Sequence, residues 1–147
     1  MAVALGSNVG DRVSHVVHAV DRLSLLLSDV VVSTFIETVP EHDPNDPLFL
    51  NAALVGATEE SPERLLAALL AIEVERGRER SHLGAPRTLD LDLVLVGELV
   101  VESTDLQLPH PRFRSRSFVL RPLVQIAPGL VDPVTGRTMS ELLRLLQ

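Results

Sequence analysis

The chain has 147 residues and carries 20 acidic and 13 basic side chains, which gives it a net charge of −7 at pH 7. This acidic balance disfavours general binding to nucleic acid, and no apolar run is long enough to span a membrane. The absence of cysteine excludes disulfides, a thiolate nucleophile and cysteine-bound zinc. We expect a cytoplasmic protein that forms a single domain over residues 1–147.

The first half of the chain alternates apolar runs with one helical pattern. Apolar and β-branched runs predict strands over residues 2–5, 30–36 and 49–57. Apolar residues at helical spacing predict a helix over about 10–27. The proline-rich segment 37–47 is predicted to be a loop.

A second helix is predicted to begin at Ser61, an N-cap followed by Pro62, and to end near residues 76–77. A polar, basic loop over 77–87 leads into a strand over 88–96. Gly97 and Glu98 predict a hairpin turn into an apolar segment over 99–101. A short helix over 115–126 follows, and the last helix starts near 138, where Thr138 and Glu141 fit a capping box.

The order strand–helix–strand–strand–helix–strand is typical of one fold class. It predicts a ferredoxin-like βαββαβ sandwich of the α+β class, with an antiparallel sheet, helices and C-terminal additions.

Two carboxylates interrupt the strand that reads TLDLDLVLV. Successive side chains of a strand point to opposite faces, so Asp90 and Asp92 share one face, with Cα atoms about 6.6 Å apart. Such a pair can hold one or two Mg²⁺ ions whose other ligands are waters and phosphate oxygens. The alternatives are a solvent-facing alternation and a network of salt bridges with nearby arginines.

All 13 basic side chains are arginines, and eight of them lie between Arg76 and Arg121. The absence of lysine excludes a Walker A lysine, a kinase strand lysine and a Schiff-base lysine. Guanidinium groups suit phosphate oxygens because they present paired N–H donors. A nucleotide would therefore be held by arginines and metal rather than by a P-loop.

Other polar and aromatic residues each allow two interpretations. His110, between two prolines, can donate to a phosphate or can be an ordinary exposed histidine. Phe49 and Phe118 can stack on a flat ring or pack in the core. Asn51 can bind the edge of a heterocycle or cap a turn.

Four segments, in order, resemble the 6-hydroxymethyl-7,8-dihydropterin pyrophosphokinases of folate biosynthesis: ALGSNVGDR, FLNAA, RGRERSHLGAPRTLDLDLVLVG and LPHPRFRSRSFVLRPLVQIAP. The resemblance covers nearly the whole chain, and PRTLDLDL and LPHPR…FVLRPL are its most specific parts. It implies a ferredoxin-like fold. It also implies a reaction that moves the β,γ-pyrophosphoryl group of ATP onto the pterin hydroxymethyl oxygen and releases AMP. The implied partners are ATP, hydroxymethyl-dihydropterin and two Mg²⁺ ions, and we expect a monomer.

The same resemblance implies roles for particular residues. The metal ligands would be Asp90 and Asp92. The catalytic positions correspond to Arg78, Arg87, Asp90 and Asp92. The nucleotide-binding positions correspond to Glu73, Arg80, Arg87, His110 and Arg116. The pterin pocket corresponds to Thr38, Pro40, Phe49, Asn51 and Phe118, with the two phenylalanine rings on either side of the pterin. The loop over 77–87 is expected to close over ATP and exclude water.

Two other functions stay open on the residues alone. The first is another Mg²⁺-dependent DxD enzyme, such as a phosphotransferase, phosphohydrolase or nucleotidyltransferase, which would act without any pterin. The second is a non-enzymatic ferredoxin-like nucleotide-binding module in which the aspartates and arginines only form salt bridges. A module of salt bridges alone would gain no thermal stability from Mg²⁺ and ATP, whereas a binder would.

Overall fold

The computed structural model describes residues 1–41, 43–78 and 88–147. Its main sheet is antiparallel, in the order β2 (Ser28–Val32), β4 (Phe49–Ala57), β1 (Ala2–Ser7) and β5 (Asp90–Leu95). The helices α1 (Arg12–Leu26) and α2 (Pro62–Glu75) connect β1 to β2 and β4 to β5. This order and these connections confirm the predicted ferredoxin-like α+β fold.

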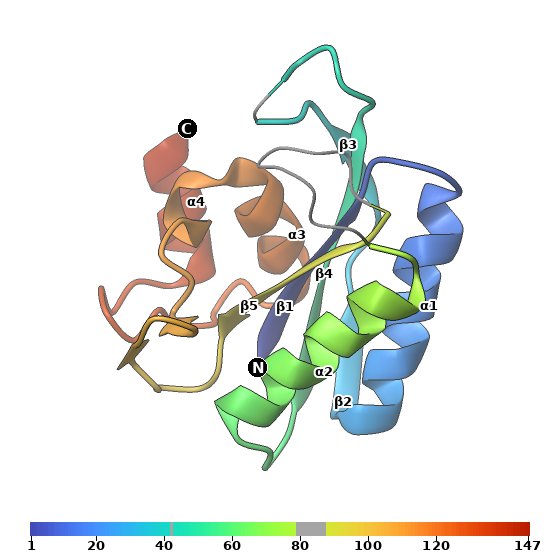
Figure 1. Ribbon diagram of the computed structural model, residues 1–147. Helices are drawn as coiled ribbons and strands as arrows, with labels where there is room; N and C mark the ends of the chain where they lie inside the picture. The colour runs from blue at the N-terminus through green and yellow to red at the C-terminus, as the bar shows by residue number, and fades with distance from the viewer. Residues whose placement is uncertain (42, 79–87) are drawn as a thin grey trace.

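The two faces of the sheet are covered by different helices (Figure 1). On one face, α1 and α2 contribute Val16 and Leu69 to a buried cluster that also holds Leu91 of β5. On the other face, α3 (Ser117–Ile126) and α4 (Met139–Leu146) form a second cluster with Val94 of β5. A 3₁₀ turn, η1 (Phe113–Ser115), leads into α3. The C-terminal additions thus form a third layer.

The predicted strand over 30–36 is wrong in extent, because β2 ends at Val32 and a separate strand, β3 (Ile36–Thr38), begins at the last residue of the predicted range. The predicted loop over 37–47 is therefore wrong at its first two residues, which belong to β3. Both strands pair with β4. The division falls at Ser33, whose N–H donates to the Ala53 carbonyl at 2.9 Å. The Ser33 hydroxyl in turn accepts from the Ala53 N–H at 2.9 Å. A side-chain oxygen therefore replaces a backbone carbonyl of the ladder, which lets the chain leave β4 and return to it.

The predicted hairpin from β5 is also wrong. Gly97 has a positive φ of 53° and turns the chain as expected. However, β6 (Val101–Glu102) pairs with β7 (Gln107–Leu108), and not with β5. Two residues per strand make this a small separate ribbon.

The predicted starts of α2 and α4 are confirmed by their N-capping contacts. The Ser61 hydroxyl accepts from the Arg64 N–H at 3.3 Å, and Pro62 takes the first turn of α2. Thr138 and Glu141 form the capping box that starts α4. Within the described ranges, no helix combines the length and apolar character needed to cross a membrane.

Asp132 joins η1 to the connection between α3 and α4. Its side chain is fully buried. The carboxylate accepts from both Arg114 Nε at 2.6 Å and Arg114 Nη2 at 2.9 Å. It also accepts from the Thr135 hydroxyl at 2.7 Å and the Val134 N–H at 3.0 Å. These contacts make Asp132 the centre of the C-terminal layer's polar bonding.

Substitution of Asp132 by asparagine is expected to lower the free energy of unfolding at pH 7 by about 2 kcal/mol. Burial raises the pKa of the Asp132 carboxyl, but hydrogen bonds from Arg114, Thr135 and Val134 outweigh burial and lower it from 3.8 to about 2. The carboxylate therefore stabilises the fold above about pH 4, and this contribution is lost as the pH falls through about 2. Urea unfolding at pH 7 and pH 3 measures the effect, with exposed Asp21→Asn as control. Equal losses at both pH values would contradict this pKa.

Candidate active site

Asp90 and Asp92 lie on the face of β5 that turns toward the C-terminal layer. The side chain of Asp90 is 22% exposed and that of Asp92 is 32% exposed. Val94, the next residue on that face, is buried in the second cluster. Leu91 and Leu93 are buried on the opposite face, in the cluster with α1 and α2. The predicted alternation is therefore confirmed, and the two carboxylates lie where the cover of helices over this face ends.

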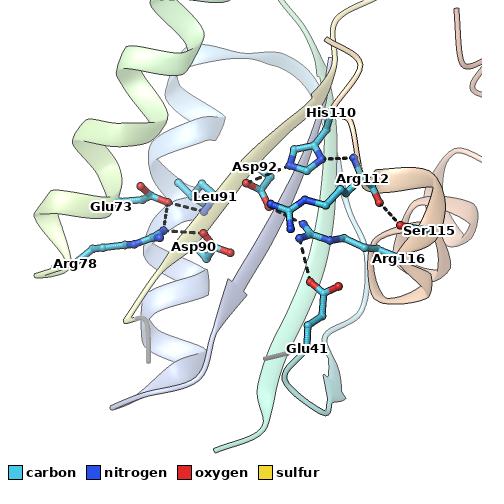
Figure 2. A network of polar contacts seen from close by, with 10 residues as sticks. All are labelled: Glu41, Glu73, Arg78, Asp90, Leu91, Asp92, His110, Arg112, Ser115 and Arg116. Atoms are coloured by element: carbon cyan, nitrogen blue, oxygen red, sulfur yellow. Dashed lines mark hydrogen bonds and ion pairs between the residues drawn. The ribbon is translucent and has the colours of Figure 1, made fainter. Parts of the chain in front are cut away.

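A buried ion pair on the α2 side of β5 fixes Asp90 (Figure 2). Glu73, in α2, has a side chain that is only 2% exposed, and its Oε2 accepts from the Leu91 N–H at 2.8 Å. Arg78 Nη1 donates to Glu73 Oε2 at 2.6 Å and to Asp90 Oδ1 at 2.7 Å. The Glu73 carboxylate thus ties the end of α2 to β5, and Arg78 orients the Asp90 carboxylate.

The turn that ends α2 brings Arg78 to this position. Gly77 has a positive φ of 76°, which suits glycine, and its N–H donates to the Val74 carbonyl at 2.9 Å. The Arg78 N–H then donates to the Glu73 carbonyl at 3.2 Å. The chain therefore changes direction immediately after α2, and the Arg78 side chain extends toward the start of β5.

His110 and Arg116 approach Asp92 from the C-terminal layer (Figure 2). His110 Nε2 is 3.9 Å from Asp92 Oδ1, and Arg116 Nη1 is 3.8 Å from Asp92 Oδ2. The His110 N–H donates to the Val94 carbonyl at 2.7 Å, which fixes this segment beside β5. A carboxylate, an imidazole and a guanidinium group therefore converge in one place.

The His110 ring is neutral at pH 7. Burial, and then the charges of Arg116 and Arg112, lower the pKa of His110 to about 4. Its Nδ1 accepts from the Arg112 N–H at 3.1 Å, so the neutral ring carries its proton on Nε2. His110 accordingly presents a neutral donor beside Asp92.

Asn51 and Thr38 lie on the other side of the same face. The pairing of β3 with β4 sets Thr38 opposite Phe49, and Asn51 Nδ2 donates to the Thr38 hydroxyl at 2.5 Å. Gly6 of β1 pairs with Asn51 on one side and with Asp90 on the other. A Cβ at Gly6 would lie 2.8 Å from Asn51 Oδ1, so a larger residue here would have to displace the Asn51 amide. Asn51, Gly6 and Asp90 therefore form one continuous row across three strands.

Phe118 and Pro40 complete this side. The Arg116 guanidinium lies 5.5 Å from the centre of the Phe118 ring, in cation–π geometry. Pro40 is buried. Its neighbour Glu41 bonds Arg116, with Oε1 3.0 Å from Nη2. Arg116 thus connects the carboxylate side of the site to the aromatic side.

Not all predicted site residues can be compared with the structure. Arg80, Arg87 and most of the loop over 77–87 lie outside the described residues, and the closing of that loop stays a prediction. Conversely, Gly6 lies in the site although its residue type gave no sign of a role. The contact that a Cβ at Gly6 would make becomes visible only once the strands are in register. For Glu41, the resemblance places the acidic loop beside the presumed pterin pocket but does not predict the contact with Arg116.

Acidic, imidazole and guanidinium groups converging on one face of a ferredoxin-like sandwich suit an enzyme that transfers phosphoryl groups, because that chemistry depends on positioning and charge stabilisation. Residues 2–128 match the protein family described as 7,8-dihydro-6-hydroxymethylpterin-pyrophosphokinase (HPPK). The chain belongs to this family. The description of the family names a pyrophosphokinase, which is a transferase.

Relatives of similar length carry a matching name. Proteins named 2-amino-4-hydroxy-6-hydroxymethyldihydropteridine pyrophosphokinase are 40% identical in Pseudomonas aeruginosa and 39% identical in Methylorubrum extorquens. These matches cover 96% and 98% of this chain, and 88% and 91% of the relatives. The folic acid synthesis protein fol1 of Pneumocystis carinii is 38% identical over 94% of this chain, which spans 19% of that longer protein.

A solved structure supports the fold. The crystal structure of Plasmodium falciparum HPPK-DHPS with SDX-DHP matches with a TM-score of 0.72. The match covers 98% of this chain and 43% of that chain, at 14% sequence identity. At this identity the likeness concerns the fold alone.

Proposed function

We propose that this chain transfers the β,γ-pyrophosphoryl group of ATP to the hydroxymethyl oxygen of 6-hydroxymethyl-7,8-dihydropterin and releases AMP. The observation that carries this proposal is the Asp90–Asp92 pair, held on one face of β5 with Arg78, His110 and Arg116 around it. In the reaction, a bond forms between the pterin oxygen and Pβ. The bond between Pβ and the α,β-bridging oxygen breaks, AMP leaves with that oxygen and the electron pair, and the hydroxyl proton is released to solvent.

The carboxylate pair fits the ligand requirements of Mg²⁺. This ion takes one or two carboxylates, keeps several waters and completes its shell with substrate phosphates. The described residues contain no group of three or more His, Cys, Asp or Glu that could hold a metal ion. Phosphate oxygens and waters would therefore supply the remaining ligands. We propose two Mg²⁺ ions on Asp90 and Asp92, which neutralise phosphate charge when bound.

The protein's own groups would position the nucleotide and stabilise developing charge. Arg78 orients Asp90 and adds positive charge beside it. His110 offers a neutral N–H, and Arg116 a guanidinium, on the Asp92 side. Negative charge grows on the bridging oxygen as AMP leaves, and fixed donors stabilise it without having to reorganise. We place Glu73, Arg80 and Arg87 on the nucleotide side as well.

The pterin would lie on the Asn51 side of the row across β4, β1 and β5. The Asn51 amide both donates and accepts, so it can pair with the polar edge of the heterocycle. Phe49 and Phe118 would contact the two faces of the ring. Thr38 supports Asn51 through their hydrogen bond, and Pro40 gives the pocket a rigid wall.

The products of the reaction test this proposal. Incubation with Mg²⁺, ATP and 6-hydroxymethyl-7,8-dihydropterin is expected to yield AMP and the pyrophosphorylated pterin in equal amounts, and chelation of Mg²⁺ should stop the reaction. Anion-exchange chromatography and ³¹P NMR identify both products. Formation of ADP or free phosphate would instead indicate another DxD enzyme. No turnover, together with no stabilisation by Mg²⁺ and ATP, would indicate a structural module.

A further inference from the structure

Arg116 is bound by a carboxylate from outside the sheet. Glu41 follows the buried Pro40 in the connection between β3 and β4, and its Oε1 lies 3.0 Å from Arg116 Nη2 (Figure 2). The Arg116 side chain is 11% exposed, whereas the Glu41 side chain is 45% exposed. The guanidinium group is thus enclosed in the site, and its carboxylate partner reaches in from the surface.

The contacts of Arg116 rank Glu41 as its nearest acceptor. Asp92 Oδ2 is further away, at 3.8 Å from Nη1. The ring of Phe118 lies at 5.5 Å. Arg116 Nε is buried and makes no hydrogen bond within the described part of the chain. The closest charged contact of the Arg116 guanidinium is therefore the one between Nη2 and Glu41.

From this geometry we infer that Glu41 competes with the nucleotide's phosphates for Arg116 and thereby sets the affinity of the site for a polyphosphate. The inference rests on the proposed function. A carboxylate and a phosphate present the same kind of oxygen acceptor to Nη2, so a phosphate can take both N–H donors of Nη2 only by displacing Glu41. An ion pair with a half-exposed partner is weak, so an incoming polyphosphate can displace Glu41. Part of the binding free energy of the polyphosphate is therefore used to displace Glu41.

Substitution Glu41→Gln tests this competition because it removes the charge and keeps the volume. The dissociation constants of Mg²⁺–α,β-methylene-ATP and of Mg²⁺–tripolyphosphate, measured by calorimetry, are expected to fall about two- to fivefold. Asp43→Asn is the matched control, since it removes the same charge from the same connection. Asp43 accepts from the Asn45 N–H at 2.9 Å, a bond that asparagine can keep. The affinities of the Asp43→Asn variant for both ligands are expected to equal those of the unmodified chain.

A double-mutant cycle locates the effect at Arg116. In an Arg116→Gln background, Glu41→Gln is expected to leave both dissociation constants unchanged, because the shared group is missing. Equal gains in affinity in Glu41→Gln and Asp43→Asn would instead indicate a long-range effect of net charge and would overturn the inference.

Two further outcomes separate this inference from the proposed function. Unchanged or weaker binding by Glu41→Gln, with AMP still formed, would overturn the inference alone. If the unmodified chain bound neither Mg²⁺–nucleotide nor tripolyphosphate, the proposed function would fail and the inference with it. Thermal unfolding of each variant establishes that the compared proteins are folded.

Discussion

Substitution of Asp92 by alanine is expected to lower kcat/KM by at least about a thousandfold while the fold survives. The carboxylate lies on the partly exposed end of its face of β5, and Ala4 is its cross-strand partner in β1. Alanine therefore fits the strand. Loss of the Asp92 carboxylate removes a proposed metal ligand and the negative charge closest to His110, and it leaves Arg116 with Glu41 as its carboxylate partner.

Initial rates of AMP formation and the midpoint of thermal unfolding measure the two parts of this prediction. Asp92→Asn keeps the size of the side chain and removes its charge, so it should also lose most activity. Asp105→Asn is the control, because Asp105 is exposed in the connection between β6 and β7. Wild-type turnover by Asp92→Ala would exclude a catalytic role for this carboxylate. Loss of the unfolding transition would show that Asp92 supports the fold.

Truncation of Glu73 to alanine is expected to lower the free energy of unfolding by about 3–5 kcal/mol. The carboxylate is buried and is the common acceptor of Arg78 Nη1 and of the Leu91 N–H. Without it, a guanidinium that is only 6% exposed loses one of its two carboxylates, and a backbone donor of β5 loses its acceptor. Removal of one member of a buried pair costs more than the pair contributes, because the other member stays desolvated.

Urea unfolding measures this loss, and Glu73→Gln separates its causes. Glutamine can still accept from the Leu91 N–H, so its loss should be smaller. Glu75→Ala provides a control on the same helix, since Glu75 is partly exposed and pairs with His18 and Arg22. That surface pair is expected to contribute about 0–1 kcal/mol. If Glu73→Ala raised the KM for ATP without any loss of stability, Glu73 would be a nucleotide contact only.

The elements that the sequence predicted well are those with a strong local pattern. Periodic apolar residues and capping residues located α1, α2 and α4, and the span predicted for β4 matches the structure. The two errors have non-local causes. The break at Ser33 depends on its bonds with Ala53 of β4. The pairing of β6 depends on β7, which has only two residues and no recognisable strand pattern.

The candidate site, too, has features that the sequence predicted and features that depend on the folded chain. The alternation in one strand was enough to predict that Asp90 and Asp92 share a face. By contrast, the contact of Glu41 with Arg116 joins two connections that meet only in the folded chain. Glu73 could be matched to the nucleotide side by resemblance, but its burial beneath β5 follows from the packing of α2. The alternation therefore predicted the shared face of the two aspartates, the resemblance supplied the other candidate residues, and the fold determines which of them touch.

The row formed by Asn51, Gly6 and Asp90 fixes how far apart the two substrates would be held. Neighbouring strands are spaced by about 4.8 Å, so the outer two residues are separated by about 10 Å through two backbone ladders. That length is independent of the connecting loops, which can differ among relatives without moving donor and acceptor apart. A bulkier residue in place of Gly6 would displace the Asn51 amide and so disturb the Asn51 end of the row, even though it touches neither reacting atom.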